Sequence, residues 1–203
     1  MINIAVLVSG GGTNLQALID ATKNGVIKSG KIKLVVSNKK DAYALVRAQN
    51  ENIKSEVVCK SDFNSNEEFE EKIISVLKSN DIDLIVLAGF MCILSKNFTD
   101  AFSGRILNIH PSLIPEFCGE GFYGLRVHKA VLASGKKITG ATVHYVNEIP
   151  DGGEIIMQKQ VEVKKGDTPE VLQRRVMEEA EWIIYPKAVE SVSQLLLKDK
   201  ENN

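Results

Sequence analysis

The chain has 203 residues, a length that suits one α/β domain built around a single large core. Its 44% hydrophobic and 25% charged residues are typical of an ordered globular protein, and 25 basic against 26 acidic side chains leave almost no net charge. This balance argues against broad nonspecific binding to nucleic acid, although a local basic patch could be hidden in a neutral total. We expect one domain over residues 1–203 with a disordered tail at residues 198–203.

The cysteines and the N-terminus indicate a cytoplasmic protein. Cys59, Cys92 and Cys118 lie far apart without C-x-x-C spacing, which is typical of reduced thiols and not of a disulfide framework. The first apolar run lacks a basic flank and ends in glycines, so it predicts a strand and not a signal peptide. No run reaches the roughly 20 apolar residues of a membrane span. We therefore expect neither a membrane nor a nucleic-acid partner.

Strand-like and helix-like segments alternate along the first half of the chain. Continuous apolar runs predict buried strands, and apolar residues at helical spacing predict amphipathic helices. The predicted strands are 2–9, 32–38, 54–60, 83–90 and 104–110, and the predicted helices are 13–25, 42–50 and 65–80. This order predicts an α/β fold with a single doubly wound, mostly parallel, Rossmann-like sheet.

The C-terminal part has a different pattern. The runs 137–147 and 154–163 alternate apolar and polar residues around a turn-like "EIPDGG", which predicts a more exposed, antiparallel strand pair. Thr168 as a cap and Pro169 in the first turn then predict a long final helix, which Pro186 breaks or kinks.

A glycine-rich turn, "SGGGTN" at residues 9–14, joins the first strand to its helix. Glycines let the backbone approach a ligand closely, and the free amides of a helix N-terminus suit an anion. The turn lacks the third glycine of G-x-G-x-x-G and the Gly-Lys-Ser/Thr of a P-loop. It favours a mononucleotide or a sugar phosphate over NAD or ATP, with a ligand-free tight turn as the alternative.

Asn108 and His110 share one face of the strand that ends in "LNIHPSLIP", because side chains alternate along a strand. An amide beside an imidazole suits the stabilisation of an oxyanion, and Asp151 of "PDGG" is the candidate carboxylate that fixes the imidazole's protonation. A polar cap at a strand end and a common turn are the alternatives. His144 by itself indicates a satisfied, half-buried histidine, whereas His128 is expected to open a helix and could line the site.

Five stretches occur in a characteristic order: "VLVSGGGTNLQALID", "LAGFMCILS", "RILNIHPSLIP", "GATVHYV" and "PDGG". Together they resemble the phosphoribosylglycinamide formyltransferases, folate-dependent enzymes of purine biosynthesis, over nearly the whole chain. The resemblance implies transfer of a formyl group from 10-formyltetrahydrofolate, a co-substrate, to the glycine amine of glycinamide ribonucleotide (GAR). It also implies direct attack through a tetrahedral oxyanion intermediate, with no metal, in a monomer or homodimer.

The resemblance assigns roles to individual residues. Asn108, His110 and Asp151 match the catalytic residues. The residues that match the phosphate- and ribose-binding positions are Gly11, Gly12, Thr13, Asn14, Leu15 and Glu181. The residues that match the folate-binding positions are Met91, Cys92, Ile93, Leu94, Glu148, Ile149, Pro150 and His144. No pair of His, Cys, Asp or Glu has metal-ligand spacing such as H-E-x-x-H, so no metal is expected.

The sequence departs from the family pattern at three places. Cys92 stands where many members have an arginine that contacts the folate tail, and Glu178 stands where glutamine is common. The segment after Pro115, "EFCGEGFYGLRVH", is longer than usual, and its Arg126 could be a new anion contact. Alternatives to the GAR enzyme are another formyltransferase, a formyltetrahydrofolate hydrolase and a non-catalytic nucleotide-binding module.

Overall fold

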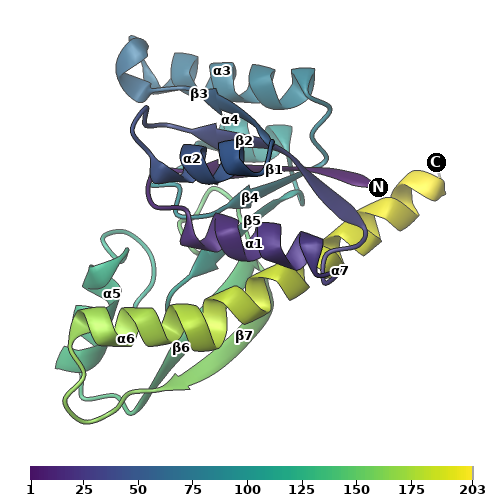
Figure 1. Cartoon of the computed structure of the whole chain (residues 1–203). Helices are drawn as coiled ribbons and strands as arrows, with labels where there is room; N and C mark the ends of the chain where they lie inside the picture. The colour runs from purple at the N-terminus through teal and green to yellow at the C-terminus, as the bar shows by residue number, and fades with distance from the viewer. Residues whose placement is uncertain (203) are drawn as a thin grey trace.

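Seven strands form one twisted sheet in the computed structural model, which describes residues 1–202 (Figure 1). The strands are β1 (Ile2–Val8), β2 (Gly30–Ser37), β3 (Lys54–Val57), β4 (Leu84–Leu87), β5 (Ile106–His110), β6 (Ile138–Tyr145) and β7 (Ile155–Glu162). Their order across the sheet is β3-β2-β1-β4-β5-β6-β7. Strands β1 to β5 are parallel, and β6 is antiparallel to both β5 and β7. The predicted α/β fold class is confirmed.

Helices cover both faces of the sheet (Figure 1). They are α1 (Thr13–Lys23), α2 (Tyr43–Asn50), α3 (Asn66–Ser79), α4 (Lys96–Ala101), α5 (Leu125–Ala133), α6 (Pro169–Val176) and α7 (Trp182–Glu201). The first apolar core contains side chains of α1, α2, α5, α6 and α7, and the second contains those of α3 and α4. Along β1, Val6 faces the first core and Leu7 the second, so a central parallel strand is apolar on both faces. Within residues 1–202, no helix combines the length and apolar character needed to cross a bilayer.

The C-terminal strands differ from expectation in their exposure. The antiparallel pairing of β6 with β7 is confirmed, but only β7, at the edge of the sheet, is largely exposed. Strand β6 is buried over Thr139–His144 because it also pairs with β5 and therefore lies inside the sheet. A pattern read from one strand does not show which strands flank it.

The final helix begins as predicted and then continues further than predicted. The Thr168 side chain accepts a hydrogen bond from the Val171 amide (3.3 Å), and Pro169 occupies the first turn. Helix α7 runs through Pro186 without ending, so a break at Pro186 is wrong, and the alternative, a kink, stays a prediction. The irregularity lies just before it, in a π-helical turn at Met177–Glu181 that joins α6 to α7.

Residues 198–201 of the tail are helical in the structure, whereas the sequence predicted disorder for residues 198–203. Helix α7 extends to Glu201, Leu197 packs on the first core, and Lys200 forms an ion pair with Asp83 (2.7 Å). These contacts hold the last turns against the sheet. Residue 203 lies outside the described residues.

The sheet brings three predicted segments to one edge. After β1 the chain continues to β2 on one side of the sheet, and after β4 it continues to β5 on the other side. The switch point of the sheet therefore lies between the neighbouring strands β1 and β4. The glycine turn follows β1, residues 88–94 follow β4, and Asn108 and His110 end β5. Because β1, β4 and β5 are parallel neighbours, all three segments lie at the carboxyl edge where ligands bind in such folds.

Candidate active site

Four polar side chains meet at the end of β5. The Asn108 amide nitrogen lies 3.2 Å from His144 Nε2 and 3.5 Å from an Asp151 carboxylate oxygen. The other Asp151 oxygen lies 3.4 Å from His110 Nδ1. The register of β5 and β6 places Asn108 opposite His144. The structure therefore brings Asn108, His110 and Asp151 together, and it adds His144, which is fully buried and not half-buried as the sequence alone indicated.

Backbone geometry in the "PDGG" turn delivers Asp151 to this cluster. Asp151 has a φ of 55°, the left-handed region that few non-glycine residues adopt. A Cβ atom on Gly153 would lie 1.7 Å from the Tyr145 carbonyl oxygen, so only glycine allows the turn to approach the end of β6 this closely. The turn is thus built to hold its carboxylate over β5 and β6.

The long segment after Pro115 fixes both members of the His–Asp pair through its backbone. His110 Nε2 donates to the Phe117 carbonyl (2.8 Å), and the Gly119 amide donates to Asp151 (2.9 Å). The Ser112 hydroxyl donates to the Glu116 carbonyl (2.5 Å) and holds the segment on β5. Sequence reasoning missed these contacts because they involve main-chain atoms. The unusual length and the glycines of this segment were the one feature of the sequence that could have indicated such contacts.

Burial and hydrogen bonding set the protonation of the pair. Burial lowers the pKa of His110 and outweighs the nearby Asp151 charge and the Phe117 carbonyl, which raise it. Burial alone would raise the Asp151 pKa, but the hydrogen bond from His144, the charge of His110 and the Gly119 amide together lower it. The free pair is a neutral imidazole beside a carboxylate at neutral pH. Asp151 raises the pKa of His110, in line with its predicted role of fixing the imidazole's protonation, but burial has the larger effect.

His144 contacts both Asn108 and Asp151 through one ring nitrogen. Its Nδ1 donates to the Tyr145 carbonyl (2.8 Å), and its Nε2 lies 3.2 Å from the Asn108 amide nitrogen and 3.5 Å from an Asp151 oxygen. His128 has a different environment, within α5 and not at its start. It is fully buried, burial lowers its pKa to about 4, and neither ring nitrogen finds a partner among residues 1–202.

The glycine turn is packed tightly on one side and open on the other. Gly12 has a φ of 71°, and a Cβ there would lie 2.7 Å from Ala44 Cβ on α2. Arg47 Nε donates to the Gly11 carbonyl (2.8 Å), which also ties the turn to α2. No side chain caps the N-terminus of α1, so its first amides are free to face an anion.

The Glu181 side chain extends from the π-helical turn to the glycine turn. Glu181 is 6% exposed, and its carboxylate accepts a hydrogen bond from the Asn14 amide nitrogen (2.7 Å). Burial raises the pKa of Glu181 to about 7, and the Asn14 hydrogen bond only partly offsets this. The buried Asn14 Oδ1 has no partner in the described part of the chain. Glu178, by contrast, is exposed and pairs with Arg174 (2.8 Å) on the helix surface.

The predicted folate segment, Met91–Leu94, lies beside the glycine turn. The Met91 amide donates to the Ser9 hydroxyl (2.8 Å), and Leu94 is buried in the second core. Met91 and Ile93 are 53% and 65% exposed, an unusual exposure for two apolar side chains so close in sequence. Cys92 is half-buried, and burial raises the pKa of its thiol. The "EIP" turn, Glu148–Pro150, is exposed.

Comparisons with known proteins show the family of the chain. Residues 2–189 match the family described as formyl transferase. The chain belongs to the formyl transferase family. It is 44% identical over 202 residues to a phosphoribosylglycinamide formyltransferase of Haemophilus influenzae, covering 100% of this chain and 92% of the relative. The same-named Escherichia coli protein is 41% identical over 200 residues, covering 98% of this chain and 91% of the relative.

A solved structure shows the same fold. The crystal structure of glycinamide ribonucleotide transformylase 1 from Symbiobacterium toebii has a TM-score of 0.90 and 40% identity, covering 96% of this chain and 88% of that one. The predicted resemblance and the predicted enzyme class, a formyltransferase, are confirmed. The roles of individual residues stay predictions, because similarity of the whole chain does not test them.

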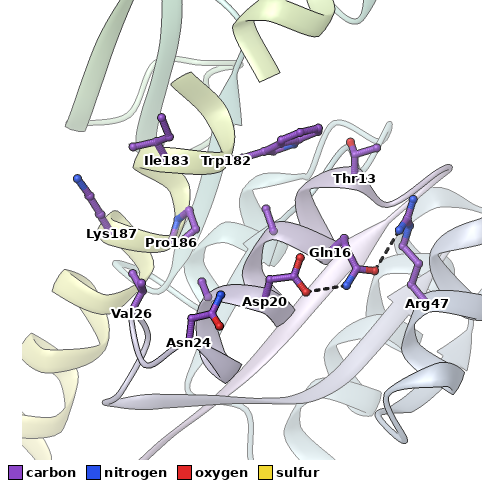
Figure 2. Close-up of a pocket in the computed structure, with 12 residues that line it drawn as sticks. Thr13, Gln16, Asp20, Asn24, Val26, Arg47, Trp182, Ile183, Pro186 and Lys187 are labelled. Atoms are coloured by element: carbon purple, nitrogen blue, oxygen red, sulfur yellow. Dashed lines mark hydrogen bonds between the residues drawn. The ribbon is translucent and has the colours of Figure 1, made fainter. Parts of the chain in front are cut away.

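A groove of about 500 Å³ lies between α1 and α7 of this formyltransferase (Figure 2). Figure 2 shows Gln16 bridging Asp20 and Arg47 along its floor, with Trp182 above. Thr13 is the one predicted site residue that lines it. The groove therefore borders the glycine turn without containing the Asn–His–Asp cluster. Within residues 1–202, no group of three or more His, Cys, Asp or Glu could hold a metal ion.

Proposed function

We propose that this formyltransferase transfers the formyl group of 10-formyltetrahydrofolate to the glycine amine of GAR in purine biosynthesis. The observation that supports this most is the meeting of three sequence-distant elements at one sheet edge: the glycine turn, the exposed apolar segment Met91–Leu94, and the Asn108–His110–Asp151 cluster. The relatives named for this activity cover nearly the whole chain.

The acceptor substrate would bind between α1 and the π-helical turn. The uncapped amides of α1, from Gly11 to Leu15, would hold the phosphate of GAR. Glu181 would accept hydrogen bonds from the ribose hydroxyls, and the unpartnered Asn14 Oδ1 is a second acceptor beside it. In this proposed arrangement the glycine amine would lie toward the strand ends and the cluster on β5.

The donor substrate would bind at the segment that follows strand β4. Met91 and Ile93 offer apolar surface to the pterin ring, and the backbone from Met91 to Leu94 offers donors and acceptors. The exposed turn Glu148–Pro150 would cover it from the opposite side, with His144 fixed beneath the cluster. N10 and its formyl group would then lie beside Asn108.

The chemistry needs an oxyanion donor and a proton carrier. The amine lone pair attacks the formyl carbon, a C–N bond forms, and the former carbonyl oxygen becomes an oxyanion that Asn108 Nδ2 stabilises. That negative charge favours the imidazolium form of His110, so the Asp151–His110 pair takes up the proton that the amine loses. Collapse breaks the bond between the formyl carbon and N10, and the pair returns the proton to N10. No covalent enzyme intermediate is required.

A spectrophotometric assay with 10-formyl-5,8-dideazafolate tests the proposal. We expect release of deformylated folate only when GAR is present. Release that does not depend on GAR would instead indicate a hydrolase, and phosphate-ligand binding without any release would indicate a non-catalytic module. Formyl-GAR in the products, identified by mass spectrometry, separates transfer from hydrolysis.

The proposal includes a cytoplasmic enzyme that needs no metal and acts on small molecules, as a monomer or homodimer. Its Cys59, Cys92 and Cys118 are free thiols, which suits a reducing compartment. Cell fractionation and light scattering at assay concentrations test the location and the oligomeric state.

A further inference from the structure

Helix α3 carries a buried carboxylate that takes no part in the site described so far. Glu70 is 3% exposed and accepts hydrogen bonds from the Ser95 amide (3.0 Å), the Asn66 side-chain amide (3.0 Å) and the Ser95 hydroxyl. A buried carboxylate is costly unless donors satisfy its oxygens. Two of its three donors belong to Ser95, 25 positions away in sequence. Glu70 therefore fixes one particular point of another segment.

That point is the C-terminal end of the Met91–Leu94 segment. Ser95 follows Leu94 directly and caps α4, because its hydroxyl accepts from the Phe98 amide (3.4 Å). The N-terminal end of the segment is tied elsewhere, where the Met91 amide donates to Ser9. The segment is thus held at both ends by side chains from other parts of the fold, while Met91 and Ile93 project into solvent between them.

We infer that Glu70 is a positioning residue for the donor substrate, an inference that rests on the proposed function of Met91–Leu94. Backbone groups bind a ligand more tightly when they are already ordered, because binding then costs less conformational entropy. The Ser9 anchor adjoins the glycine turn, so its loss would disturb both substrates. The Glu70 anchor lies on α3, whose apolar side chains pack in the second core, and its loss should disturb the folate side alone.

Glu70→Gln tests this with a side chain of the same size. One Glu70 oxygen accepts from the Asn66 and Ser95 amides and the other from the Ser95 hydroxyl, and glutamine replaces one of these two acceptors by an NH2 group. We expect the KM for 10-formyl-5,8-dideazafolate to rise about tenfold. The substitution weakens the hydrogen bonding to Ser95, and only part of this loss affects the binding of the ligand. The KM for GAR and kcat at saturation should stay within about twofold. Glu71→Gln, an exposed neighbour on the same helix, is the matched control.

A double-mutant cycle separates positioning from general loss of stability. If Glu70 acts through Ser95, Ser95→Ala should raise the same KM, and the double variant should add little to the larger single effect. Additive effects, or equal rises in the KM values of both substrates, would overturn the inference.

The thiol of Cys92 gives a readout that needs no substrate. In a Cys118→Ser background, with Cys59 buried, the rate of Cys92 labelling by a disulfide reagent reports the order of the segment. Glu70→Gln should label several-fold faster than Glu71→Gln, and equal rates would refute the anchor. A wild-type protein without formyl transfer would remove the proposed function but leave this labelling result standing, so the two failures are distinguishable.

Discussion

Glu181 offers the sharpest quantitative test, because its burial makes its contribution to the free energy of unfolding depend on pH. We consider Glu181→Gln. The glutamine oxygen can still accept from Asn14 Nδ2, so the hydrogen bond between the two side chains is kept. The substitution keeps the size of the side chain and removes only its ionisation.

The magnitude follows from the raised pKa. Burial raises the pKa of Glu181 from its ordinary 4.5 to about 7, so the folded chain binds more protons than the unfolded chain between these values. The stabilisation that comes from protonated Glu181 is fully present below the pKa of this group in the unfolded chain. It is lost as the pH rises through the pKa of the group in the folded chain. At about 1.4 kcal/mol per pH unit, wild-type protein loses about 3 kcal/mol across this window, and the glutamine variant does not.

Urea denaturation at about pH 5 and about pH 8 measures this difference directly. The free energy of unfolding of Glu181→Gln minus that of wild type should increase by about 2–3 kcal/mol from the lower to the higher pH. Other titrating groups cancel, since both proteins share them. A difference that stays constant within about 0.5 kcal/mol would refute the reasoning. The same variant should raise the KM for GAR about tenfold, because a neutral amide is a weaker acceptor for the ribose hydroxyls.

Asp151→Asn should lower kcat by roughly two to four orders of magnitude with little change in the KM for GAR; near-normal turnover would remove Asp151 from the mechanism. Gly12→Val should lower the free energy of unfolding by about 2–4 kcal/mol, because its Cβ would overlap Ala44. Gly11→Ala, with no atom near the added Cβ, should leave stability within about 0.5 kcal/mol and raise the KM for GAR; an unchanged KM would place the phosphate elsewhere. Gly153→Ala should reduce both stability, by about 1–3 kcal/mol, and kcat; a neutral effect would contradict the tight turn.

Local patterns in the sequence predicted most of the secondary structure. Strand and helix periodicities are properties of a few consecutive side chains, so β1, β5 and the capped start of α6 could be read without any knowledge of neighbours. Helix α4 was missed because its six residues are too few for a helical period to show, and the start of α5 was expected at His128, whereas the helix begins at Leu125. The path of the last helix was misread, because the π-helical turn before Pro186 depends on tertiary packing and not on a sequence pattern.

The sequence by itself determined the shared face of Asn108 and His110, since alternation along a strand fixes it. Only the tertiary structure decided that Asp151 reaches His110 and that Glu181 meets Asn14, because long-range contacts depend on how separate elements pack. It also decided the protonation of the site. The pKa of a group depends on its burial and on its neighbours from other segments, such as the Phe117 carbonyl and the Gly119 amide, and no local pattern encodes these.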